Sequence, residues 1–204
     1  MMKKPLAAMA ALAALATLAG CTSDDGGNPQ QDDQTESAAP AAPEVVNGQP
    51  IEFELTAPEG TEVVDGADRA DPLSENHISY IYSVADGVLT EAVLVTSYAT
   101  DQAIAAGDFE SLLAAVSEYD TDRGFEAQPA QYRHAIVNGM PGVHRYLESE
   151  VDGTAVKEYN HYLASGSHMI QITCRWSEYY ADVMAACRSI EETFPVPEGW
   201  EPQL

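Results

Sequence analysis

The chain has 204 residues, and its 33 acidic against 9 basic side chains give a formal net charge of −24 at pH 7. So negative a surface excludes nucleic acids and anionic phosphates as natural partners. The length suits one folded domain with a sizeable core, preceded by segments of different composition.

The N-terminus resembles the export leader of a bacterial lipoprotein. Lys3 and Lys4 precede an apolar run, Leu6 to Ala19, which is too short to span a bilayer as a permanent helix. Small residues before Cys21 match a lipobox, in which the cysteine thiol receives lipid and becomes the new N-terminus. The alternative is an ordinary signal peptide followed by a chance cysteine. We expect residues 1–20 to be removed and lipid on Cys21 to anchor the protein to the outer face of the cell membrane.

Residues 21–49 are the predicted tether. This segment contains acidic residues, glycines and prolines but no basic or aromatic residue, so it cannot bury enough apolar surface to fold. Its paired aspartates lack the alternating ligand positions and turn glycine of a calcium loop. We therefore expect a disordered spacer that holds a single domain, residues 50–204, away from the membrane.

The first half of that domain is predicted to contain three strands and a helix. Alternating apolar residues indicate a strand over residues 51–55. Residues 77–85 and 88–98 flank an Asp-Gly dipeptide, which is typical of a two-residue hairpin turn. Apolar residues at helical spacing then predict an amphipathic helix over residues 108–119, with Asp108 as its N-cap.

The second half predicts an antiparallel meander covered by a helix. Four strand-like runs are separated by Asn138-Gly139, Asp152-Gly153 and Ser165-Gly166. The runs are residues 132–137, 143–151, 154–164 and 167–175. Ser177 is expected to cap a C-terminal helix that ends at Pro195. The predicted fold class is α+β, a largely antiparallel sheet packed against two or more helices.

Four short motifs lie within residues 50–197. They are Phe53-x-Leu55-x-x-Pro58-x-Gly60, Asn138-Gly139-Met140-Pro141-Gly142, Ile170-Gln171-Ile172-Thr173 and Ile190-x-x-Thr193-Phe194-Pro195-Val196. Together they resemble the PsbP-like superfamily, which includes extrinsic photosystem II proteins, a yeast Ran-binding import factor and the LpqN-type lipoproteins of actinobacteria. The resemblance implies an αβα arrangement and a binding or accessory role without an active site. The chain departs from the family at Thr61, where many members carry tryptophan, and by its Cys174 and Cys187.

The sequence offers no common catalytic motif. It lacks G-x-S-x-G, H-E-x-x-H, a Walker loop and G-x-G-x-x-G, so common hydrolase, metalloprotease and nucleotide-binding functions have no local support. We favour a lipid-anchored, extracytoplasmic accessory protein that binds a protein or cell-envelope partner, without catalytic residues, cofactor or metal. The alternative is an extracytoplasmic hydrolase that acts on envelope material with two of the many carboxylates.

Two histidines are predicted to face each other. A two-residue turn at Asp152-Gly153 places His144 opposite His161 and Tyr146 opposite Tyr159. Such a pair suggests a transition-metal or pH-sensing site, with His168 as a candidate neighbour. We favour the alternative of two structural histidines packed among tyrosines, because no third ligand is evident.

The remaining two cysteines are expected to form a disulfide. With Cys21 committed to lipid, Cys174 and Cys187 remain, and thiol pairs close in the oxidising compartment of an exported protein. Cys174 shares a strand face with Ile170 and Ile172, while Cys187 lies on the apolar stripe of the last helix, so both point into one interface. The alternative is two buried free cysteines that act as small hydrophobic residues.

Overall fold

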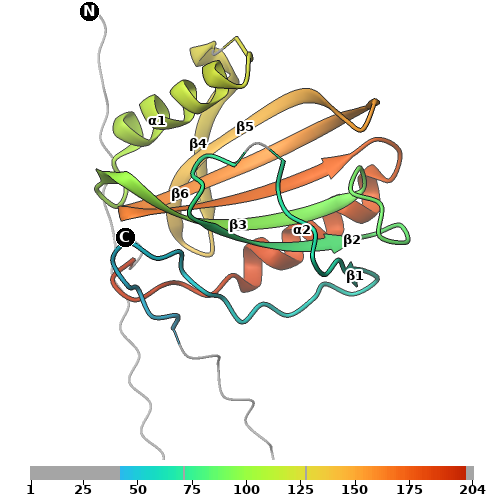
Figure 1. The fold of residues 1–204 in the computed structure, drawn as a ribbon, viewed down its shortest axis with the longest axis horizontal. Coiled ribbons are helices and arrows are strands. Elements are labelled where there is room, and N and C mark those ends of the chain that lie inside the picture. The colour runs from blue at the N-terminus through green and yellow to red at the C-terminus, as the bar shows by residue number, and fades with distance from the viewer. Residues whose placement is uncertain (1–41, 71, 127, 201–204) are drawn as a thin grey trace, which may run out of the picture. The chain divides into compact units, whose positions relative to one another are not determined.

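A six-stranded antiparallel sheet dominates the computed structural model, which describes residues 42–70, 72–126 and 128–200 (Figure 1). The strands lie in the order β1-β2-β3-β6-β5-β4. Their bounds are β1 Glu62–Val63, β2 His77–Ser83, β3 Ala92–Ile104, β4 Tyr132–Val137, β5 Met140–Val151 and β6 Thr154–Trp176. The helices are α1 (Phe109–Asp122), α2 (Tyr180–Thr193) and a 3-10 turn, η1 (Pro129–Gln131). The predicted α+β fold class is confirmed.

The longest strand, β6, folds back on itself. Residues 154–162 pair with β5, whereas residues 166–175 pair with β3. Glu158 Oε1 accepts from Arg175 Nε over 2.8 Å, although the two residues are 17 apart in the chain. A straight strand of that length would separate them by about 55 Å. The chain therefore reverses between two arms that run side by side, as the Ser165-Gly166 signal predicts (Figure 1).

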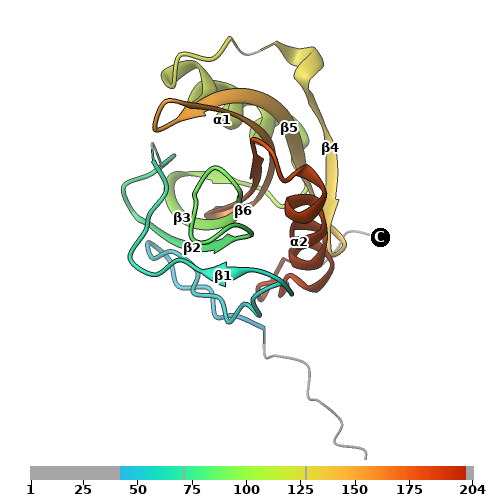
Figure 2. The same cartoon turned by 90° about the vertical axis from the view of Figure 1, so that its right-hand side faces the viewer.

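Each helix covers a different face of the sheet (Figure 2). The buried side of α2 packs on residues of β3 and the second arm of β6. The buried side of α1 packs on β5 and β6. Its core also includes Tyr98 and Met169, which lie on the opposite face from the α2 core because neighbouring strand residues point in opposite directions. The α2 core includes Val93, Val95, Ile170, Ile172, Cys174, Val183, Cys187, Ile190 and Phe194. The α1 core includes Tyr98, Ile104, Leu112, Val116, Tyr119, Tyr162 and Met169.

The predicted strand over residues 51–55 is wrong. Within the described ranges this segment is extended but lies outside the sheet. Ile51 and Phe53 are buried as the alternation predicts, yet their N–H groups donate to the Ser97 hydroxyl at 2.8 Å and the Tyr80 hydroxyl at 2.7 Å. The alternation of apolar residues correctly predicts which side chains are buried. A strand also needs backbone hydrogen bonds to a neighbouring strand, and here side-chain hydroxyls accept from the N–H groups of Ile51 and Phe53 instead.

The β2–β3 hairpin is confirmed, but its loop is longer than two residues. Ser83 is paired with Ala92, so residues 84–91 connect the strands. Asp86 and Gly87 adopt the expected positive φ values of 46° and 76° at the tip of this loop. The extra residues place the end of the loop beside the start of α2.

The first helix is capped as predicted, but the second is not. Asp108 accepts from the N–H of Ser111 at 3.1 Å and so caps α1. At α2, the N-cap residue Tyr179 makes no side-chain cap, and the expected cap residue Ser177 is itself a hydrogen-bond donor. Its acceptor is the carboxylate of Glu91 from the β2–β3 loop.

Glu91 holds the three residues that lead into α2. Its Oε1 accepts from the N–H groups of Ser177 and Glu178, both at 2.8 Å, and its Oε2 accepts from the N–H of Tyr179 at 3.0 Å. The hydroxyl of Ser177 donates to the same carboxylate. A single negative side chain therefore satisfies three N–H groups of the segment that leads into α2, and it interacts favourably with the positive end of the helix dipole.

The last residues of the predicted tether lie against the domain. His168 Nε2 lies 3.0 Å from the carbonyl oxygen of Val46 and 3.1 Å from that of Gln49. The N–H of Glu198 donates to the carbonyl oxygen of Pro43 at 3.3 Å. Residues 43–49 therefore contact the domain that the sequence predicts to begin at residue 50. Residues 1–20, Cys21 and the tether up to residue 41 lie outside the described residues.

Candidate functional site

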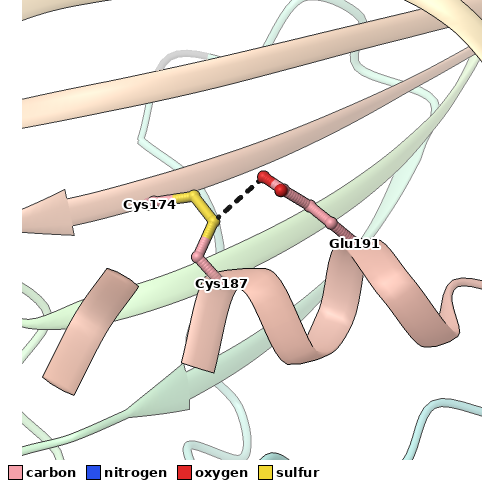
Figure 3. A group of neighbouring side chains, drawn as sticks. All are labelled: Cys174, Cys187 and Glu191. Atoms are coloured by element: carbon pink, nitrogen blue, oxygen red, sulfur yellow. Dashed lines mark hydrogen bonds between the residues drawn. A yellow bond between two sulfur atoms is a disulfide. The ribbon is translucent and has the colours of Figure 1, made fainter. Parts of the chain in front are cut away.

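Cys174 and Cys187 form the disulfide drawn in Figure 3, with their Cα atoms 5.8 Å apart. Cys174 lies in the second arm of β6, and Cys187 lies in the middle of α2. Both side chains are fully buried in the α2 core. The predicted pairing agrees with the strand repeat of β6 and the helical repeat of α2. Each repeat directs the cysteine of its element toward the interface between them.

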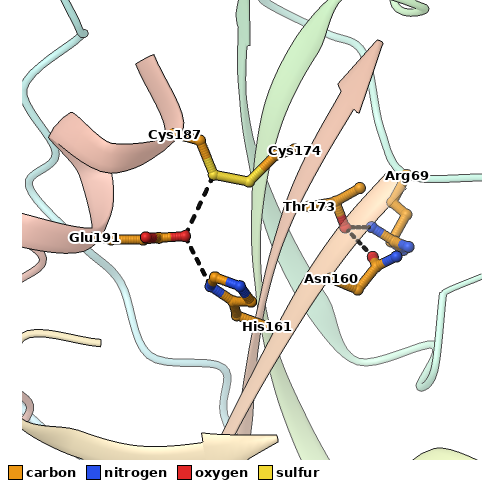
Figure 4. The surroundings of a disulfide bond; sticks show 7 residues. All are labelled: Arg69, Asn160, His161, Thr173, Cys174, Cys187 and Glu191. Atoms are coloured by element: carbon orange, nitrogen blue, oxygen red, sulfur yellow. Dashed lines mark hydrogen bonds and ion pairs between the residues drawn. A yellow bond between two sulfur atoms is a disulfide. The ribbon is translucent and has the colours of Figure 1, made fainter. Parts of the chain in front are cut away.

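Glu191 adds a carboxylate to this junction. It follows Cys187 by one helical turn, and its Oε1 lies 3.4 Å from the sulfur of Cys187. The same oxygen lies 2.7 Å from Nδ1 of His161, which comes from the first arm of β6 (Figure 4). The side chains of His161 and Glu191 are only 17% and 21% exposed, so this contact is partly shielded from water.

The predicted pairing of His144 with His161 is confirmed. The two residues are direct partners of β5 and β6, and their ring centroids are 5.7 Å apart. Burial lowers the pKa of His144, and the neighbouring His161 lowers it further. His168 does not join the pair but contacts backbone oxygens of the N-terminal segment. The third partner is instead Glu191, which sequence reasoning missed because no local pattern links a residue of α2 to β5 and β6.

An aromatic row, which we define as Tyr146, Tyr159, Trp176 and Tyr180, continues along the same face. Neighbouring ring centroids in the row are 5.4, 5.5 and 5.2 Å apart. Tyr146 and Tyr180 are 36% and 51% exposed, whereas Trp176 is buried beneath them. Rings at these distances and tilts pack against one another, so the row presents a surface of apolar rings that also carries tyrosine hydroxyls.

The opposite face of the sheet holds a buried group of charged side chains. Glu158 pairs with Arg175, and Asp120 pairs with Arg145. Arg69 donates to the Thr173 hydroxyl at 2.8 Å (Figure 4). Burial acts to raise the pKa of Glu158, but the charges of Arg175 and Arg69 outweigh burial and lower that pKa. Burial also acts to raise the pKa of Asp120, and there it outweighs the hydrogen bond from Tyr132 and the charge of Arg145, so that pKa is raised. Both buried carboxylates are therefore engaged by arginines.

A cleft of about 480 Å³ opens between α1 and the outer part of β3. Its floor includes Ile104 and Met169, while carboxylates line its rim. These carboxylates belong to Glu75, Asp101, Glu118 and Asp122. Apolar walls with convergent polar groups are typical of small-molecule sites, and the negative rim would favour a cationic or neutral molecule over an anion.

Comparisons with known proteins do not assign the chain to a family. No protein-family model matches it, and no curated protein matches it. Among solved structures, one from Bacteroides thetaiotaomicron is similar at a TM-score of 0.39 and 8% sequence identity. That similarity covers 64% of this chain and 40% of the other, so this chain spans less than half of its length. In the described ranges, no helix is long and apolar enough to cross a membrane.

Proposed function

We propose that this protein is a lipid-anchored, extracytoplasmic binding or accessory protein without catalytic activity. The aromatic row is the surface through which it contacts a protein or cell-envelope partner. Exposed aromatic rings are enriched where proteins bind partners, because each ring buries a large area at a low cost in conformational entropy.

The position of the aromatic row supports this function. It lies where β5, β6 and the first turn of α2 meet, and Tyr146 and Tyr180 stand at its two exposed ends. The disulfide beneath α2 constrains the helix that carries Tyr180. A surface held in this way needs little ordering when it binds, which favours affinity.

Two sequence features support the location. The lipobox at Cys21 predicts a membrane anchor, and a cysteine pair within bonding distance agrees with an oxidising compartment. The resemblance to the PsbP-like superfamily agrees with an accessory role. The anchor and the family both remain predictions.

The test uses the compact unit of residues 39–204 as bait on a solid support. We expect it to retain a component of surface-exposed envelope material, and we expect the double variant Tyr146→Ala/Tyr180→Ala to lose most of that retention. The matched control is Ile136→Ala, because Ile136 is 76% exposed but lies on β4, outside the row. Equal retention by the wild type and the double variant would refute the assignment of the surface.

The alternative function is an envelope-acting hydrolase. Its active site would lie in the cleft between α1 and β3, which carboxylates line. Glu118 and Asp122 lie one helical turn apart on α1, and both line this cleft. If the alternative holds, the domain releases soluble fragments from purified envelope material, and the double variant Glu118→Gln/Asp122→Asn abolishes the release. Our proposal expects no release by either protein.

A further inference from the structure

Three groups that can bind a metal converge where the second arm of β6 meets α2, and a histidine from the first arm of β6 lies beside one of them. The sulfurs of Cys174 and Cys187 and a carboxylate oxygen of Glu191 all lie within 4.8 Å of one another. His161 Nδ1 extends the group, because it lies 2.7 Å from Oε1 of Glu191. Two sulfurs, one imidazole nitrogen and one carboxylate oxygen make a donor set that suits zinc.

We propose that reduction of the disulfide converts this junction into a binding site for a thiophilic divalent cation of the zinc class. The ligand atoms are Cys174 Sγ, Cys187 Sγ, Glu191 Oε1 and His161 Nδ1. While the disulfide is closed, each sulfur is bonded to the other and is a poor ligand, so the oxidised protein does not use this site. The site is therefore gated by the redox state of the cysteine pair.

Two of the distances lie near those between the ligands of a tetrahedral ion, and the imidazole of His161 has to turn toward the sulfurs to complete the set. Zinc binds sulfur at about 2.3 Å and nitrogen or oxygen at about 2.1 Å, which places neighbouring ligand atoms about 3.3–3.8 Å apart. Cys187 Sγ and Glu191 Oε1 are already 3.4 Å apart. Glu191 Oε1 and His161 Nδ1, at 2.7 Å, need to separate by about 0.7 Å to reach the spacing of two ligands of one ion. The largest change is the opening of the sulfur–sulfur bond itself.

Burial and charge also favour a cation here. Both cysteines are 0% exposed, and the partly exposed His161 and Glu191 leave one side open for an ion to enter. Two thiolates and one carboxylate carry three negative charges, which a divalent ion largely neutralises.

The chemistry balances with an external dithiol as the reductant. Two electrons from that dithiol break the bond between Cys174 and Cys187, and its own two sulfurs join as a new disulfide. Its two protons pass to the freed cysteine sulfurs. Binding of the cation then releases both protons to solvent, because only thiolates bind the metal tightly.

The experiment compares oxidised and reduced forms of residues 39–204, with a phosphine reductant that does not compete for the metal. Cobalt(II) is the spectroscopic probe and zinc the competitor. We expect the reduced form to bind one cobalt ion with thiolate charge-transfer absorption, which zinc abolishes. We expect the oxidised form to show no such absorption. Zinc should also raise the melting temperature of the reduced form alone.

Variants distinguish a folded site from two adventitious thiols. Glu191→Gln and His161→Ala should each weaken binding by about tenfold or more, and Glu192→Gln is the matched control on the exposed side of α2. Unchanged binding in both ligand variants would overturn the proposal, because thiols in an unfolded chain do not need Glu191 or His161. No binding by the reduced form, or equal binding by both forms, would also overturn it. These outcomes are independent of partner retention by the aromatic row.

Discussion

Removal of the Glu91 side chain should destabilise the start of α2. Glu91 is 3% exposed and accepts from three consecutive N–H groups, those of Ser177, Glu178 and Tyr179. The variant Glu91→Ala leaves all three without this acceptor. The side chains of these three residues are exposed, so water can reach the start of the helix and replace part of the loss.

The magnitude follows from two contributions. Loss of a single helix N-cap costs about 0.5–2 kcal/mol, and loss of a negative charge at the helix start costs about 0.3–1 kcal/mol more. Because Glu91 serves three N–H groups rather than one, we expect Glu91→Ala to lower the free energy of unfolding by about 3 kcal/mol. For a domain of this size that corresponds to a fall of about 6–12 °C in melting temperature.

The assay is thermal unfolding followed by circular dichroism, with Glu62→Ala as the control because Glu62 is exposed on β1. Glu91→Gln keeps one acceptor oxygen without the charge and should fall between the wild type and Glu91→Ala. A loss in Glu91→Ala no larger than that in Glu62→Ala would refute the reasoning.

The same carboxylate should make α2 sensitive to acid. Burial acts to raise the pKa of Glu91, but its hydrogen bonds from Ser177, Glu178 and Tyr179 outweigh burial and lower that pKa below the usual 4.5. A lowered native pKa stabilises the fold above the ordinary value, and that stabilisation is lost as the pH falls through the lowered pKa. The stability difference between the wild type and Glu91→Gln should therefore shrink below about pH 4.5.

Three further predictions concern the cysteines and one glycine. Reduction of the bond between Cys174 and Cys187, which are 13 residues apart, should lower the free energy of unfolding by about 3 kcal/mol. Two free thiols found by alkylation and mass measurement of the unreduced protein would contradict this. Gly142→Ala should lower the free energy of unfolding by more than about 2 kcal/mol in a denaturant titration, because the Cβ of the alanine would lie 2.2 Å from the carbonyl oxygen of Tyr162. Cys21→Ala should leave the membrane fraction, and retention of a cleaved variant would contradict the lipid anchor.

Features that depend on neighbours in the chain could be predicted from the amino-acid sequence alone. The turn at Asp152-Gly153 sets the register of β5 and β6, so the meeting of His144 with His161 could be predicted from spacing alone. The cap of α1 by Asp108 is also local. The disulfide was predictable because two periodic elements each carry one cysteine on the buried side.

Contacts between distant segments became visible only in the folded structure. Glu91 accepts from the residues just before a helix that begins 89 residues later, and Glu191 meets His161 across the junction of α2 with β6. Residues 51–55 look like a strand because they alternate, yet side chains of β2 and β3 take their hydrogen bonds. In each case a polar group that is shielded from water pairs with a group that packing brings close to it. Local sequence patterns do not predict such pairs, because the two groups are far apart in the chain.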